Sequence, residues 1–304
     1  MSHEHRSSGE GGELSASVGP VGLATAADRP NCGSDDRVLL QTLDDRGIDV
    51  SPVVWSDTSL AWDAYELIVI RSCWDYHRRP DAFRSWIDLL ASLGVDLWNP
   101  PATVRWNLEK TYLRELASDG VRAVPTAVIE QDSSRQLETV LRDNGWTEAV
   151  LKPAIAGTAY LTSRVSLESA TRDQPQLNEI ITHSDALVQP FIPEIKTAGE
   201  WSLIFIGGQF SHSIIKYVSD DFRVQSEFGG TVILKPAPKR FIDEASRIID
   251  DIRHDTHYAR VDGVVVDGEF TLMELELIEP ELFFRQCPSA TEHFADLVID
   301  ALER

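Results

Sequence analysis

An acidic hairpin near the C-terminus constrains this sequence more than any other stretch. Residues 260–280 alternate apolar and acidic side chains on both sides of Asp267-Gly268, and an Asp-Gly pair between two alternating runs predicts a β-hairpin. Residues i and i+2 of a strand share a face, so Glu274 and Glu276 point the same way and Asp262 can face them from the neighbouring strand. Three carboxylates on one face repel one another unless a cation lies between them. Oxygen donors without a nearby His or Cys favour Mg²⁺ or Mn²⁺ over zinc; the alternative is an edge hairpin with a solvated acidic face.

The overall composition argues against several classes of partner. The chain has 304 residues, 42% of them hydrophobic, which is enough for two or three domains with cores of their own. Its net charge of −21 argues against nucleic acid, because phosphate binding needs a basic face. No apolar run approaches the roughly 20 residues of a membrane span, and residues 1–13 lack the apolar region of a signal peptide. We therefore expect a cytoplasmic protein with neither a nucleic-acid nor a membrane partner. Three isolated cysteines indicate reduced thiols.

The N-terminal part of the chain predicts a leader followed by an α/β domain. Residues 1–19 are rich in Ser, Gly, Glu and His, which is typical of a disordered segment. Between residues 20 and 105, expected strands at 21–24, 48–55, 67–70 and 95–98 alternate with expected helices at 36–46 and 81–93. A polar cluster follows the third strand, and ligands often bind where strands of an open α/β sheet end. This cluster comprises Arg71, Ser72, Trp74, Asp75 and Tyr76.

Two members of this cluster suit an amino-acid-like substrate. Arg71 suits a carboxylate because a guanidinium binds it through two hydrogen bonds, and Asp75 suits an ammonium. The alternative for Trp74 and Tyr76 is that they are packing residues.

The rest of the chain alternates further helices and strands around a second basic position. A helix is expected at 107–119, carrying Lys110, followed by strands at 127–129, 149–152, 161–165 and 186–191 and helices at 133–144 and 177–183. Lys152 ends a strand and precedes a loop of small residues, a pattern that suits phosphate because backbone N–H groups can approach closely. The alternative is an ordinary hairpin loop. Strands at 200–206 and 209–217 flank Gly207-Gly208, and helices are expected at 238–253 and 291–303.

The order of these parts resembles the ATP-grasp superfamily. The shared order is a Lys on a helix, a Lys before a small-residue loop, a QPFI strand, a Gly-Gly hairpin, an Arg loop and then Asp…Glu-x-Glu. Within its glutathione-synthetase/RimK-like branch, the segments WDY, WN-x-x-K-x-Y-L, GEWSLIF, FSHSIIK and MELELIEP resemble the cyclo-ligases of cycloserine biosynthesis. The resemblance implies an α/β (α+β) fold: an N-terminal α/β domain at 20–105, then two α+β subdomains at 106–190 and 191–304 that clasp ATP.

The resemblance also implies roles for individual residues. Lys110 and Lys152 would contact the ATP phosphates, and the loop at Gly157 and Thr158 would close over them. The remaining implied ATP contacts are Gln189, Phe191 and Ile192 for adenine and either Glu194 or Glu200 for the ribose. The implied catalytic residues, facing the γ-phosphate and the acyl substrate, are Lys216 and Arg223. His212 would be a strand histidine or a substrate contact.

The implied metal site departs from the superfamily pattern at one position. Asp262, Glu274 and Glu276 would hold Mg²⁺ or Mn²⁺, but the superfamily usually has Asn where Glu276 stands. The extra carboxylate changes the charge of the site and can bring a Lys or Arg closer. Glu279 is a lesser candidate ligand.

The activity implied by the resemblance is an ATP-dependent carboxylate–amine ligation. An acyl phosphate would form on a small amino-acid-like substrate and react with an amine, releasing ADP and phosphate. Three alternatives stay open: an intramolecular cyclo-ligase, a kinase on the same fold, and a nucleotide-binding module without turnover. The resemblance leaves a homodimer open as well.

Overall fold

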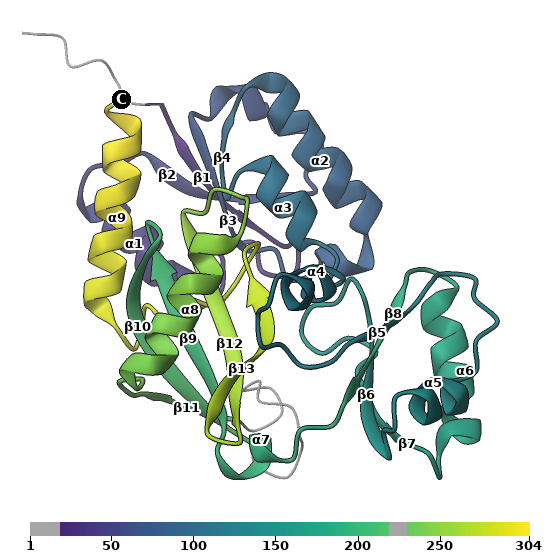
Figure 1. Cartoon of the computed structure of the whole chain (residues 1–304). Coiled ribbons are helices and arrows are strands. Elements are labelled where there is room, and N and C mark those ends of the chain that lie inside the picture. Colours follow the sequence, from purple (N-terminus) through teal and green to yellow (C-terminus); the bar gives the residue numbers. More distant parts are fainter. Residues whose placement is uncertain (1–18, 219–229) are drawn as a thin grey trace, which may run out of the picture.

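The computed structural model describes residues 19–218 and 230–304 and builds the chain around three β-sheets (Figure 1). The predicted leader at 1–19 lies, apart from Gly19, outside the described residues, and so does Arg223. None of the described helices is long and apolar enough to cross a membrane. The boundaries expected at residues 105 and 190 stay predictions.

The N-terminal sheet is parallel and has the strand order β2-β1-β3-β4. Its strands are β1 (Val21–Thr25), β2 (Val50–Val54), β3 (Leu67–Ser72) and β4 (Asp96–Trp98). Every residue of β1 and β3 is buried, as expected for central strands covered on both faces. The connecting segments are α1 (Asp36–Asp45), α2 (Pro80–Leu93) and the short η1 (Trp62–Ala64) and η2 (Tyr76–Arg78). Helix α2 starts with proline and stops at Gly94, whose left-handed φ of 73° a glycine adopts without strain.

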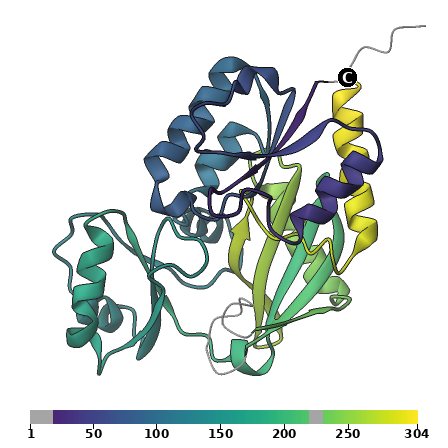
Figure 2. The same ribbon diagram turned by 180° about the vertical axis from the view of Figure 1, so that it is seen from behind.

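The second sheet is antiparallel and stands to one side of the molecule (Figures 1 and 2). It has the order β5-β8-β6-β7, built from β5 (Ala127–Ile129), β6 (Glu148–Pro153), β7 (Ser163–Ser166) and β8 (Ala186–Pro190). Helices α5 (Leu137–Asp143) and α6 (Ala170–Ile181) contribute to a core of its own. This part of the chain therefore carries β6, and with it Lys152, as a separate layer.

The third sheet, with the order β11-β10-β9-β12-β13, shares a core with the first. Its strands are β9 (Glu200–Ile206), β10 (Gln209–Tyr217), β11 (Thr231–Leu234), β12 (Tyr258–Val266) and β13 (Glu269–Glu276). The helices of this part are α7 (Glu194–Thr197), α8 (Lys239–Asp251) and α9 (Pro288–Leu302). One cluster joins Leu23 and Leu39 of the N-terminal part to Ile204 and to Phe294 of α9. The first and third sheets are thus held together by apolar burial.

The helix expected at 107–119 is instead two short helices, which corrects the position of Lys110. Helices α3 (Pro101–Asn107) and α4 (Tyr112–Ser118) flank a turn, and Lys110 lies in that turn. The break lets two side chains reach the outer edge of β13. Asn107 Nδ2 donates to the Leu275 carbonyl at 2.8 Å and its Oδ1 accepts from Leu277 N at 2.9 Å, while Tyr112 Oη contacts the backbone of Leu275. These side chains supply the hydrogen bonds that another strand would make.

Asn99 ties the N-terminal sheet to the two strands of the acidic hairpin. It is completely buried; its Nδ2 donates to the carbonyls of Tyr258 (2.8 Å) and Leu277 (2.7 Å), and its Oδ1 accepts from His257 N at 2.6 Å. One side chain therefore hydrogen-bonds to backbone groups of three residues, Tyr258, Leu277 and His257.

We expect Asn99→Ala to lower the free energy of unfolding by about 3 kcal/mol or more, because each buried backbone group left unpaired costs about 1–3 kcal/mol. Urea unfolding followed by circular dichroism measures the change. Asn178→Ala is the control, since Asn178 is exposed on α6. A similar, small loss in both variants would contradict this account of Asn99.

Candidate active site

A cavity of about 380 Å³ opens where the three sheets meet, and it collects most of the predicted site residues. Residues of the second sheet and its loop form one side, and β9, β10, β12 and β13 form another. The predicted residues on its walls are Trp74, Tyr76, Lys110, Lys152, Gly157, Thr158, Gln189, Phe191, Ile192, Glu200, Lys216, Asp262, Glu274 and Glu276.

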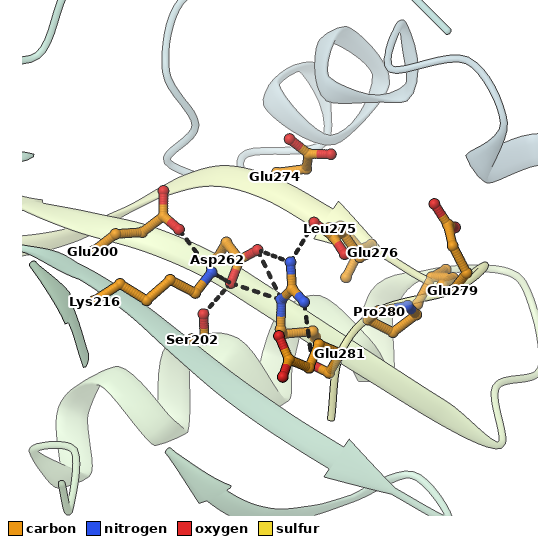
Figure 3. A network of polar contacts seen from close by, with 12 residues as sticks. Glu200, Ser202, Lys216, Asp262, Glu274, Leu275, Glu276, Glu279, Pro280 and Glu281 are labelled. Atoms are coloured by element: carbon orange, nitrogen blue, oxygen red, sulfur yellow. Dashed lines mark hydrogen bonds and ion pairs between the residues drawn. The ribbon is translucent and has the colours of Figure 1, made fainter. Parts of the chain in front are cut away.

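The hairpin places its acidic residues on one face, as the sequence predicts. Asp262 is paired with Glu274 in the β12–β13 register, and Arg260 is paired with Glu276. The turn at Asp267-Gly268 has left-handed φ angles of 54° and 83°, the geometry of a two-residue hairpin loop. Each of the three carboxylates faces at least one cation, and Figure 3 shows the part of this network around Asp262 and Glu276.

Asp262 is the most strongly compensated carboxylate. It accepts hydrogen bonds from the Ser202 hydroxyl, from Lys216 Nζ at 3.3 Å and from Arg260 Nε at 3.0 Å. Burial alone would raise the pKa of Asp262, but the positive charges of Arg260 and Lys216 outweigh it and hold the pKa at about 2. Asp262 therefore stays ionised at any working pH.

Glu274 holds the two lysines predicted to contact phosphate. Lys110 Nζ lies 2.5 Å from one carboxylate oxygen and Lys152 Nζ lies 4.0 Å from the other. Burial opposes ionisation of Glu274, but the two ammonium groups prevail and lower its pKa. Burial also lowers the pKa of Lys152, against the attraction of Glu274. The lysines are thus gathered at one carboxylate and face the cavity.

Glu276 is less well compensated than its neighbours. Its carboxylate pairs with Arg260, yet burial raises its pKa to about 7 despite that guanidinium, and the charges of Asp262 and Glu274 add to the rise. Nearby, Glu200 pairs with Lys216 at 2.9 Å. Glu276 is therefore the member of this carboxylate row that its basic neighbours compensate least.

The donor set suits a hard divalent cation. Asp262, Glu274 and Glu276 offer only oxygen atoms on one face, which is the chemistry of a Mg²⁺ or Mn²⁺ site. Within residues 19–218 and 230–304, no group of three acidic, His or Cys side chains converges as a ready-made metal cluster, because basic side chains lie between the carboxylates. The oxygen donors of the three carboxylates and the face that they share nevertheless suit such an ion.

One end of the cavity is apolar and lies beside β8. Gln189 is buried on β8 and donates to the Thr126 hydroxyl at 2.9 Å, and Arg164 stacks on the Phe191 ring at 4.0 Å. Apolar side chains complete this end; they are Val150, Ile192, Ile195 and Met273. Of the two predicted ribose contacts, Glu200 lines the cavity, whereas Glu194 lies on α7 and does not.

The small-residue loop after β6 lies on the cavity in an unusual backbone conformation. Thr158 and Ala159 have positive φ angles of 48° and 55°, which cost of order 1 kcal/mol each outside glycine. The loop rests on the N-terminal part: Tyr160 packs on His77 with ring centres 5.0 Å apart, and a side chain at Gly157 would meet His77 Nδ1 at 3.0 Å. The second sheet's loop and the N-terminal part are therefore in direct contact at the cavity.

The structure corrects the predicted roles of Arg71 and Ser72. Both belong to β3 and are completely buried, so they do not face a substrate. Arg71 donates to Asp36 at 2.9 Å and to the Pro280 carbonyl at 2.7 Å, and the Ser72 hydroxyl binds the same carboxylate. Their role is to anchor α1 and the segment after β13.

Asp75 and His212 are also away from the cavity walls. Asp75 accepts from Trp55 Nε1 at 2.7 Å and pairs with Arg79 at 2.6 Å, so its charge is already satisfied. His212 is buried on β10, where its Nδ1 contacts the Ser211 hydroxyl at 3.0 Å. Arg223 lies outside the described residues.

The sequence analysis did not identify Arg260 or several other residues of the cavity wall as candidate site residues. Arg260 precedes Asp262 by two positions and so shares its face, a signal present in the strand pattern. Asn107 and Tyr112 belong to the WN-x-x-K-x-Y-L segment, but only the edge of β13 reveals what they do. The other wall residues, which no sequence pattern marks, include Arg29, Ser34, Phe283 and Arg285.

Comparisons with known proteins agree with this architecture. Residues 21–99 match the family model described as the N-terminal domain of the D-cycloserine synthetase DcsG. The cycloserine biosynthesis protein DcsG of Streptomyces lavendulae is 28% identical over 207 residues, which are 66% of this chain and 68% of that protein.

Two solved structures extend the similarity across the fold. The crystal structure of D-cycloserine synthetase DcsG superimposes with a TM-score of 0.83 at 25% identity, over 93% of this chain and all of that one. The D-alanine–D-alanine ligase of Bacillus anthracis complexed with ATP superimposes with a TM-score of 0.69 at 15% identity, over 94% of this chain and 98% of that one. The predicted ATP-grasp fold is confirmed, and the chain is an ATP-grasp ligase.

We expect the protein to lose stability as the pH falls from 7 to 4, in part through His212. Burial lowers the pKa of His212 to about 4, so in this window the unfolded chain takes up a proton that the folded chain does not. The loss from this residue is about 3 kcal/mol at most. His212→Asn should flatten the dependence of the urea midpoint on pH, whereas His183→Asn, at an exposed histidine, should not. Equal slopes in all three proteins would contradict the assignment.

Proposed function

We propose that this ATP-grasp ligase activates a carboxylate of a small amino-acid-like substrate as an acyl phosphate and joins it to an amine. ADP and phosphate would be the other products. The observation that carries the proposal is the convergence of Lys110, Lys152, Lys216 and Arg260 with a row of carboxylates in one cavity. Phosphoryl transfer needs positioning and charge neutralisation rather than a protein nucleophile, and the described cavity walls contain neither Cys nor His.

The basic residues divide into two groups with different tasks. Lys110 and Lys152, between the second sheet and β13, would exchange their contacts with Glu274 for phosphate oxygens. Lys216 and Arg260, at the other end of the carboxylate row, would face the transferring phosphoryl group and the acyl oxygen. The preformed positions of these charges lower the cost of reorganisation during the reaction.

Asp262, Glu274 and Glu276 would hold Mg²⁺ or Mn²⁺. The ion, when bound, would neutralise charge on the phosphates and on these carboxylates. The raised pKa of Glu276 supports this assignment, because burial and the neighbouring carboxylates leave that group short of positive charge. The apolar end of the cavity beside Gln189 and Phe191 would take adenine, and Glu200 is the better placed of the two candidates for the ribose.

An intramolecular cyclo-ligase is the second candidate. The similarity to D-cycloserine synthetase, over 93% of this chain in the solved structure, favours it. The chemistry is the same, with the amine and the carboxylate in a single molecule.

We expect ADP and free phosphate to appear in equal amounts when the protein is given Mg²⁺-ATP and its correct substrate from a panel of amino acids and their derivatives. A coupled assay for ADP and a dye assay for phosphate measure the two products. ADP with a stable phosphorylated product would favour a kinase. ATP binding without release across the panel would favour a module without turnover.

We expect Lys152→Met to lower kcat about 10²–10³-fold, the usual cost of removing one group that stabilises transition-state charge. Lys239→Met is the control, because Lys239 is 86% exposed on α8. Circular dichroism should give the same folded spectrum for both variants. Wild-type turnover in Lys152→Met would contradict the assigned role.

A further inference from the structure

One carboxylate on the cavity wall has no basic partner. Six carboxylates line the cavity, and five of them form salt bridges: Glu200 and Asp262 with Lys216, Glu274 with Lys110, Glu276 with Arg260, and Glu281 with Arg285. Within residues 19–218 and 230–304, Glu279 forms no salt bridge. Figure 3 shows its side chain standing apart from the network around Asp262, with no interaction drawn to it.

One guanidinium on the same cavity is likewise unpaired. Arg29 lines the cavity and is exposed, and it forms no salt bridge with any carboxylate that the structure describes. Its guanidinium lies 4.7 Å from the centre of the Trp74 ring. The indole Nε1 of Trp74 in turn donates to the Glu279 carbonyl at 3.1 Å. Trp74 therefore stands between this guanidinium and the residue that bears the unpaired carboxyl group.

The backbone that carries Glu279 is held in place from two sides. Besides the bond from Trp74, Arg71 Nη2 donates to the Pro280 carbonyl at 2.7 Å, and Arg260 Nη1 donates to the Glu281 carbonyl at 3.1 Å. Three consecutive carbonyls are thus fixed by side chains from the first and third sheets. A carboxylate on such a support is preorganised to receive a ligand, because little freedom is lost on binding.

The surroundings of Glu279 suit an organic ammonium better than a metal ion. A divalent cation needs several oxygen ligands, and the Glu279 carboxyl group stands apart from the network around Asp262 (Figure 3). Trp74 and Tyr76 line the same part of the cavity, and aromatic faces are compatible with ammonium groups. Burial and the charge of Glu276 raise the pKa of Glu279 to about 8, so the arrival of a positive group would be favoured there.

We propose that Glu279 and Arg29 form an amino-acid site around Trp74, in which Glu279 binds the substrate's ammonium and Arg29 binds a carboxylate. The inference rests on the proposed function and narrows its substrate to a zwitterionic amino acid. It also replaces Asp75 and Arg71, whose charges are satisfied elsewhere, as the groups that recognise the two ends of such a molecule. Glu279 and Arg29 thereby become residues that determine specificity.

The test is calorimetric binding to the full chain, saturated with Mg²⁺ and a non-hydrolysable ATP analogue. The probes are D-serine and L-serine, glycerate, which has a hydroxyl in place of the ammonium, and serinamide, which lacks the carboxylate. We expect one serine enantiomer to bind at least tenfold more tightly than glycerate or serinamide. Glu279→Gln should weaken serine at least tenfold and leave glycerate within threefold, since one charge-assisted contact is worth about a factor of ten or more. Arg29→Gln should weaken serine equally and leave serinamide unchanged.

Glu281→Gln and Arg285→Gln are matched controls, because they make the same charge changes on the same wall but in a pair that is already formed. Each should change serine binding less than threefold. Equal losses in the Glu279 and Glu281 variants would overturn the proposal, and so would equal binding of serine and glycerate to the unaltered protein. Binding of the ATP analogue without either serine would overturn it and leave the ATP-dependent function standing. If the ATP analogue does not bind either, both the amino-acid site and the proposed function are overturned.

Discussion

The outer edge of β13 is closed partly by backbone and partly by side chains: Val124 N donates to the Leu272 carbonyl at 2.9 Å and Leu272 N to the Arg122 carbonyl at 2.8 Å, and side chains bind the edge further along. Asn107 and Tyr112 bind the backbone around Leu275, and Asn99 reaches the carbonyl of Leu277. An open edge would leave these groups unpaired or available to another chain. By binding this edge of β13, the segment between β4 and α4 fixes the positions of Glu274 and Glu276 on the cavity wall. Lys110 lies in the same segment. The contact between this segment and β13 therefore positions both the Glu274 carboxylate and the Lys110 ammonium group that pairs with it.

Charge compensation is the second constraint on the cavity. Its carboxylates are too buried to be hydrated freely, so each of the stable ones is matched by a lysine or arginine from a different element. These pairs hold the basic groups in place on the cavity wall. The pKa is raised at Glu276 and Glu279, where basic side chains compensate the carboxylate only incompletely. An incoming cation would be most strongly favoured at these two positions.

The three sheets contribute different chemistry to the same space. The second sheet brings Lys152 and the loop at Gly157, the third sheet brings the carboxylate row and Lys216, and the N-terminal part brings Arg29, Trp74 and Tyr76. The first and third sheets share an apolar core, whereas the second has its own. The walls built by the first and third sheets therefore form one unit, and the wall built by the second sheet lies on another.

The sequence by itself determined the hairpin, its acidic face, the strand that ends at Lys152 and the ATP-grasp order of the parts. These features are local: alternation with period two sets the face, and an Asp-Gly turn sets the register. Only the tertiary structure decided which charged side chains form ion pairs or hydrogen bonds within the protein. Arg71 and Asp75 look like ligand contacts because they follow a buried strand, yet partners distant in sequence satisfy both. The sequence offers no local signal for Arg29 and marks Glu279 only as a lesser candidate metal ligand. That neither side chain has a salt-bridge partner among residues 19–218 and 230–304 is visible only in the tertiary structure.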